Sequence, residues 1–169
     1  MNKNIDKTSK QGDKTELLIA EFLSEALQVA ITLNKDGRYD LKIHNTTLEV
    51  KDESNYIDSG NVCIETDRLY NWQDKWEDCG ITTSQADYYI HYFSPKKLVV
   101  YKTEKMRKWL RDNHKENTTV DKRNIVSKKN EDGNKTTAGY ILPIDFLLQN
   151  ASQTEIEVIT LSDLFYKLM

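Results

Sequence analysis

The chain has 169 residues, of which 38% are hydrophobic and 30% are charged, and its formal net charge is −3. This length suits one domain with a substantial core, and a mean hydropathy of −0.71 without any apolar run of ~20 residues excludes a membrane-spanning helix. No apolar segment follows the N-terminal lysines, so we expect no secretory signal and a cytoplasmic location.

The N-terminal region predicts a flexible arm followed by an amphipathic helix. Residues 1–12 are polar, and we expect them to be flexible. Apolar residues then recur at helical spacing from Lys14 to about Gln28. Asp13 and Glu16 have the spacing of a capping box, which would begin this helix.

Two short strands joined by a polar turn are predicted over residues 38–51. Apolar and polar residues alternate in both halves, which is the pattern of half-buried strands. Residues two apart share one face of a strand, so Glu49 and Lys51 lie on the same side. If the two strands pair in register, Asp40 joins them, and two carboxylates and one ammonium converge. The alternative is a surface hairpin whose charges are solvated.

This combination of side chains suits phosphodiester hydrolysis. The phosphate is already negative and gains charge in the reaction, and a divalent cation offsets that charge and activates water. Asp40 and Glu49 would bind the ion with the carbonyl oxygen of Val50, since such ions prefer oxygen ligands. Lys51 would lie beside the attacking water or a phosphate oxygen.

The remaining elements alternate between strands and helices. Residues 67–78 are predicted to be helical or helix-turn, with Trp72 and Trp76 as core residues; the alternative for Trp76 is a base-stacking platform. Loop 80–85 carries hydroxyl groups, including that of Thr83, that could contact phosphates. The cysteines and histidines show no ligand spacing, so no structural zinc site is expected. Further strands are predicted at 61–65, 86–93, 97–102, 139–143 and 156–161, and further helices at 103–113, 144–148 and 162–169.

Charge is distributed unevenly along the chain. Residues 96–135 contain 13 Lys/Arg against 6 Asp/Glu, whereas the remainder contains 11 against 21. A basic flank beside an acidic site is what a phosphate-backbone binder uses, and Lys105, Lys108 and Arg111 are the candidate contacts on the predicted helix. The alternative, for the polar stretch around 114–137, is a solvated basic loop.

The spacing of Asp40 and the Glu49-x-Lys51 couple resembles the motif of the PD-(D/E)XK nuclease superfamily. Arg38 or Tyr39 stands where the name of the family puts a proline, a position that varies in the family. The resemblance implies a restriction-endonuclease-like core, in which helices flank a mixed central sheet. It also implies Mg²⁺ as the cofactor, with Mn²⁺ as a substitute.

Two further segments are similar to branches of this superfamily. The Gly-x-x-x-Glu pattern of residues 12–16 is similar to the opening of the Holliday-junction-resolvase branch. It implies a helix carboxylate that faces the metal, with Glu16 as the candidate and Glu21 in reserve; the alternative for Glu16 is the capping box itself. The polar loop, Gly-Asn step and apolar strand that end at Glu65 are similar to small phage-type nucleases, which makes Glu65 a candidate for an additional carboxylate.

We therefore expect a single α/β domain over residues 13–169 that acts as a metal-dependent DNA endonuclease. Junction or branched DNA is the substrate that the resemblance suggests, and two symmetric nicks would require a homodimer. Two alternatives stay open. One is a nucleic-acid-binding module on the same fold that does not cleave. The other is a phage-type protein-interaction inhibitor with an acidic face.

Overall fold

The computed structural model describes residues 5–28, 30–34, 38–70, 72, 74–113, 125–129 and 135–168. Its helices are α1 (Ile5–Leu27), α2 (Thr103–Asn113), α3 (Ile144–Gln149), α4 (Ala151–Thr154) and α5 (Leu161–Leu168), with short 3-10 helices η1 (Ser54–Tyr56) and η2 (Gly80–Thr82). Its strands are β1 (Thr32–Leu33), β2 (Leu41–Ile43), β3 (Thr46–Asp52), β4 (Asn61–Tyr70), β5 (Glu77–Asp78), β6 (Tyr88–Ser94), β7 (Lys97–Lys102), β8 (Ile125–Lys129), β9 (Lys135–Pro143) and β10 (Glu157–Ile159).

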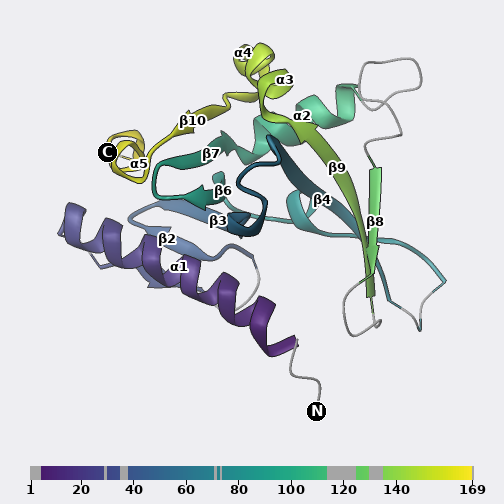
Figure 1. Cartoon of the computed structure of the whole chain (residues 1–169), viewed down its shortest axis with the longest axis horizontal. Helices are drawn as coiled ribbons and strands as arrows, with labels where there is room; N and C mark the ends of the chain where they lie inside the picture. The colour runs from purple at the N-terminus through teal and green to yellow at the C-terminus, as the bar shows by residue number, and fades with distance from the viewer. Residues whose placement is uncertain are drawn as a thin grey trace.

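Within the described residues the strands form two sheets (Figure 1). The first sheet has six strands in the order β1-β2-β3-β6-β7-β10, and the second has four in the order β5-β4-β9-β8. In the first sheet β3 and β6 run parallel, while the other neighbours are antiparallel. A parallel pair needs a crossover connection, and here the chain between β3 and β6 supplies β4 and β5 of the second sheet.

The first sheet is covered on both faces (Figure 1). Helices α1 and α5 pack on one face, and the second sheet packs on the other together with α2 and α3. Strand β6 shows how one sequence serves both layers, because successive side chains point to opposite faces. Ile90 and Tyr92 join the core under α1, whereas Tyr89 and Phe93 join the core under the second sheet. Burial on both faces explains why this strand reads as a continuous apolar run.

Helix α1 lies across the strands of the hairpin. Ile19 and Leu23 share one buried cluster with Leu41 of β2 and Leu48 of β3. This packing holds the helix against the β2–β3 hairpin. It brings Glu16 of the helix near Asp40, which directly precedes β2. Within the described ranges, no helix is both long enough and apolar enough to cross a membrane.

The expected α/β class, with a mixed sheet flanked by helices, is confirmed. The predictions for residues 86–93, 97–102 and 103–113 correspond to β6, β7 and α2. These elements have strong local patterns, since the strands are apolar on both faces and the helix has Met106 and Trp109 on its buried side.

The start of the first helix was predicted wrongly. Helix α1 begins at Ile5 rather than at Asp13, so residues 5–12 of the expected flexible arm are helical. An interior glycine such as Gly12 lowers helix stability by only about 1 kcal/mol, and the packed half of the helix supports continuation through it. Asp13 and Glu16 therefore lie inside the helix, and the capping-box interpretation of Glu16 does not apply.

The helix predicted over residues 67–78 is also wrong. Strand β4 continues to Tyr70, and β5 follows within the same stretch. The extension is stabilised by pairing with β9, in which Tyr70 is opposite Lys135. Trp72 is 70% exposed and Trp76 is 46% exposed, so neither is the core residue that the helical spacing predicted.

The polar stretch around 114–137 is partly β-structure. Strand β8 and the beginning of β9 lie in it and pair antiparallel, with Lys128 opposite Thr137. Residues 125–129 and 135–137 of the expected loop are thus strand, and residues 114–124 and 130–134 lie outside the described part of the chain.

Candidate active site

The β2–β3 hairpin fixes the carboxylate of Asp40. Leu41 pairs with Leu48, and the amide of Asp40 donates a hydrogen bond to the carbonyl oxygen of Leu48 at 2.9 Å. The amide of Val50 donates to Oδ2 of Asp40 at 2.7 Å. This register sets Asp40 across from Glu49, which is the pairing on which the expected convergence depended.

Glu49 and Lys51 share the face of β3 that is turned away from α1. Their neighbours Leu48 and Val50 are buried in the cluster under α1, so the period of two turns the charged pair toward the second sheet. Nζ of Lys51 lies 2.6 Å from Oε1 of Glu49. The hydroxyl of Ser84 donates to the other carboxylate oxygen, Oε2, at 3.3 Å. Both oxygens of Glu49 are therefore held from the protein side.

Glu16 reaches this group from α1. Its neighbour Thr15 is buried and donates a hydrogen bond to Oδ2 of Asp52 on β3 at 2.7 Å, which fixes the turn of helix that carries Glu16. Oδ1 of Asp52 in turn accepts the amide of Ser54 at 2.8 Å. Burial, followed by the negative charge of Asp40, raises the pKa of Glu16 to about 7. Glu16 and Asp40 are therefore close enough to repel each other.

The charges at this group do not balance. Burial raises the pKa of Asp40, and the charge of Glu49 raises it further. Burial alone would lower the pKa of Lys51, but Glu49 and, more weakly, Asp40 and Glu65 outweigh it and raise that pKa. The ammonium therefore stays charged, and three carboxylates face one cation. We call Glu16, Asp40, Glu49 and Lys51 the charged cluster.

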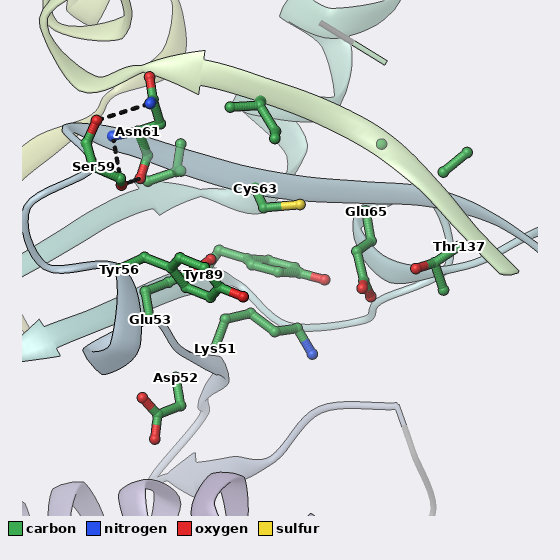
Figure 2. A pocket seen from close by; sticks show the side chains of 14 residues that line it. Lys51, Asp52, Glu53, Tyr56, Ser59, Asn61, Cys63, Glu65, Tyr89 and Thr137 are labelled. Carbon is green, nitrogen blue, oxygen red and sulfur yellow. Dashed lines mark hydrogen bonds between the residues drawn. The ribbon is translucent and has the colours of Figure 1, made fainter. Parts of the chain in front are cut away.

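The additional carboxylates differ in their placement. Glu65 on β4 faces Lys51 from the second sheet, and its charge acts on both Lys51 and Tyr89 (Figure 2). Glu21 is exposed on α1, and its charge is not among those that shift the pKa of Glu16 or Asp40. Glu16, not Glu21, is thus the helix carboxylate that the fold brings to the hairpin.

The basic candidates on α2 are engaged with carboxylates. Lys105 lies 3.4 Å from Glu155, Lys108 lies 2.6 Å from Asp112, and Arg111 lies 3.7 Å from Glu104. All three are exposed. Surface pairs of this kind are weak, so these side chains remain able to exchange partners. Within the described part of the chain, none of them forms an ion pair with the charged cluster. Thr83 is exposed directly after η2.

Arg107 supports the cluster indirectly and was not predicted from the sequence. Its Nε donates to the carbonyl oxygen of Ile81 at 3.0 Å, and its Nη2 donates to that of Ser84 at 2.7 Å. Arg107 thereby holds the loop that places the Ser84 hydroxyl on Glu49. No local pattern marks this role, because the contacts span 23 to 26 residues of sequence.

A cavity of about 400 Å³ lies between the two sheets, beside the charged cluster (Figure 2). Lys51, Glu53 and Tyr89 line it from the first sheet, and Cys63 and Glu65 line it from the second. The remaining lining residues are Asp52, Tyr56, Ser59, Asn61, Val62, Thr137, Ala138, Gly139 and Ile141.

Buried hydrogen bonds organise one wall of this cavity. Nδ1 of His91 lies 3.1 Å from Oε1 of Glu53, and Nε2 of His91 lies 2.8 Å from the hydroxyl of Tyr101. The neighbouring hydroxyl of Tyr89 is buried and has no hydrogen-bond partner among the described residues. Burial, with the charges of Glu49 and Glu65, holds the pKa of Tyr89 far above its usual range, so this hydroxyl stays protonated.

The donor set that the sequence predicts for a metal ion is Asp40, Glu49 and the carbonyl of Val50. Among the described residues, no three His, Cys, Asp or Glu side chains are grouped as a ready metal site. The charged cluster nonetheless fits a hard divalent cation, because one or two carboxylates suffice for Mg²⁺, and because burial, followed by the charge of neighbouring carboxylates, raises the pKa values of Glu16 and Asp40.

Comparison with known proteins identifies no relative. No protein-family model, curated protein or solved structure matches the chain. The chemistry of the site must therefore be argued from its own residues.

Proposed function

We propose that this protein is a Mg²⁺-dependent nuclease that hydrolyses phosphodiester bonds in nucleic acid, and that its substrate is DNA. The observation that carries the proposal is the charged cluster: Asp40 and Glu49 lie across the β2–β3 hairpin from each other, and Lys51 lies 2.6 Å from Glu49. The hairpin, the parallel strand β6 and helix α1 would form the restriction-endonuclease-like core that the motif implies.

We assign each residue of the site one role in the reaction. Asp40, Glu49 and the carbonyl of Val50 would hold the ion, and Glu16 would add a third carboxylate beside Asp40. A bound Mg²⁺ supplies charge neutralisation at the phosphate and lowers the pKa of its water. Lys51 keeps its positive charge and would contact a phosphate oxygen or the attacking water, stabilising the charge that develops there. Arg107 and Ser84 act as positioning residues, because they hold Glu49 in place.

A cleavage panel with a lysine variant tests this proposal. Linear, flapped, four-way and single-stranded DNA, and RNA of the same sequence, are incubated with the protein in Mg²⁺, in Mn²⁺ and in chelator. We expect cleavage with either ion and none in chelator. Replacing Lys51 by Ala should lower kcat at least about 100-fold, as loss of one preorganised charge does elsewhere.

Lys167 provides the matched control for this variant. It also forms an ion pair, 2.9 Å from Glu157, but lies on α5 and is not part of the charged cluster. Lys167→Ala should cleave as the wild type does. Metal-independent cleavage, or equal activity of the Lys51 and Lys167 variants, would contradict the proposal.

One observation favours a second candidate function. Glu49 already pairs with Lys51, and no group of three metal-binding side chains is formed in the described part of the chain. A nucleic-acid-binding module that does not cleave would retain such a pair undisturbed. In the same panel, salt-sensitive binding without cleavage by the wild type would support the module. A measured mass of two chains would support the dimer that symmetric junction cleavage needs.

A further inference from the structure

The cavity between the sheets has the dimensions of a ligand site. Its volume of about 400 Å³ lies within the ~300–1,000 Å³ of small-molecule pockets. Part of its wall is apolar or aromatic, and Val62, Ala138 and Ile141 contribute to it alongside the tyrosines. Tyr89 is supported from behind by Tyr101, whose ring is parallel to within 5° at a centroid distance of 5.7 Å.

Polar groups gather at one end of this cavity. Lys51, Glu65 and Tyr89 turn their polar ends toward the same region (Figure 2). Nζ of Lys51 lies 6.0 Å from the centre of the Tyr89 ring. The side chains thus offer an ammonium donor, a carboxylate acceptor and a hydroxyl around a space that aliphatic and aromatic side chains line in part.

The hydroxyl of Tyr89 lacks a hydrogen-bond partner among the described residues. Tyr89 is only 2% exposed, and this oxygen is buried. Buried hydroxyls are normally satisfied, and leaving one unpaired is unfavourable. A ligand in the cavity that accepts a hydrogen bond would remove this deficit.

We propose that the cavity binds one unpaired nucleobase of the substrate strand, next to the bond that is cleaved. A base has a flat face that stacks on aromatic side chains and an edge of donors and acceptors, which matches the walls and the polar end described above. Enzymes that act on a base extrude it from the helix, and the cost is least where the base is already unpaired.

The position of the cavity connects it to the reaction. Lys51 lines the cavity and also contacts Glu49 of the charged cluster, so a base in the cavity would carry its phosphate to the cluster. This inference rests on the proposed nuclease function and deepens it: the substrate is a strand with an unpaired or extruded base at the cleavage position, not uniform duplex.

An abasic scan tests the inference. Oligonucleotides that each lack one base, at successive positions around the cleaved bond, are compared with the intact strand by kcat/KM. We expect one position at which removal of the base slows wild-type cleavage about tenfold, as the loss of one stacked base does. Tyr89→Phe should reduce this difference, while its stability should not fall, because the hydroxyl has no partner in the free protein.

A cavity-filling variant gives the second arm. The thiol of Cys63 points into the cavity (Figure 2), so Cys63→Leu should lower cleavage of the intact strand to the abasic rate, and leave the abasic rate unchanged. Val158→Leu, an enlargement at an exposed position of β10 outside the cavity, should cleave as the wild type does. Circular dichroism and thermal unfolding establish that both variants fold; if Cys63→Leu does not, the Tyr89→Phe comparison decides.

The outcomes separate this inference from the nuclease proposal. If cleavage depends on Lys51 but no position responds to loss of its base, and Tyr89→Phe behaves as the wild type, the base-binding inference is wrong and the nuclease proposal stands. If the wild type cleaves none of the substrates, the nuclease proposal is wrong and this inference falls with it.

Discussion

Uncompensated charge is the defining feature of the site at the scale of single residues. Glu16, Asp40 and Glu49 face one ammonium, that of Lys51, and the pKa values of Glu16 and Asp40 are raised. A folded protein that maximised stability would not place these groups together. Such arrangements are typical of functional sites, and here the excess negative charge is what a divalent cation would offset.

The pH dependence of stability tests the environment of Glu16. Its pKa is raised from 4.5 to about 7 by burial and then by Asp40 and Asp13, while Lys51 opposes them and Glu49 adds a smaller effect. A raised pKa in the folded state means that protonation stabilises the fold. This contribution is fully present below pH 4.5 and is lost as the pH rises through 7.

In metal-free buffer, Glu16→Gln should therefore gain stability over the wild type as the pH rises from 5 to 8. The gain should be on the order of 1 kcal/mol, since Glu16 is only partly buried and solvent screens it. Urea unfolding at both pH values measures it. Glu21→Gln, an exposed carboxylate on the same helix, should show no such trend. A constant difference between Glu16→Gln and wild type would contradict the assignment.

The convergence of Asp40, Glu49 and Lys51 could be predicted because it depends on local rules. Alternation fixes the face of each residue, and a two-strand hairpin fixes the register. Ser84 and Tyr89 could not be predicted as neighbours of these groups. Ser84 meets Glu49 across 35 residues of sequence, and the cavity beside Tyr89 exists only because the second sheet folds over the first.

At the scale of elements, a sequence-based prediction was right where local pattern and long-range pairing agree, and wrong where they conflict. Strands β6 and β7 and helix α2 were predictable because their apolar residues have a clear period and long-range contacts agree with it. The end of β4 was not, because Leu69, Trp72 and Trp76 have helical spacing while pairing with β9 holds the chain extended through Tyr70. Tertiary pairing overrides a weak local preference there.

The connection from α2 to the cluster gives a prediction at this scale. Arg107 donates to two backbone carbonyls of the loop before β6. Lysine cannot reproduce this planar fork, so Arg107→Lys should lower the free energy of unfolding by about 2 kcal/mol and should lower kcat about tenfold through misplacement of Glu49.

Denaturant unfolding and steady-state cleavage measure the two effects. Arg111→Lys serves as the control, because Arg111 lies on the same helix, is 63% exposed at its side chain and approaches Glu104 only at 3.7 Å. It should change neither quantity. A loss of stability in Arg107→Lys without any loss of kcat would show that the loop does not position Glu49.

At the scale of the whole molecule, the two sheets contribute different parts of the site. The first sheet is buried on both faces, and its strand β3 carries Glu49 and Lys51 of the charged cluster. The second sheet closes over it and leaves the cavity between them. The sequence predicts only one central sheet. The second sheet depends on pairing of β4 with β9, which are about 75 residues apart, and no local sequence pattern indicates that pairing.

Because the cluster joins Glu16 of α1 to the β2–β3 hairpin of the first sheet, binding of an ion there should stabilise the whole domain. At a Mg²⁺ concentration ten times the dissociation constant, linkage gives about 1.4 kcal/mol, which raises the Tm by about 3–6 °C in a domain of this size. Asp40→Asn removes a ligand and also a source of repulsion. It should have a higher Tm than the wild type in chelator, and its Tm should rise little or not at all with Mg²⁺.

Thermal unfolding with and without the ion measures both effects, and Glu21→Gln should keep the wild-type response. An equal rise in Asp40→Asn would place the ion somewhere other than the hairpin, since a ligand that stabilises the fold must lose that effect when its site is removed.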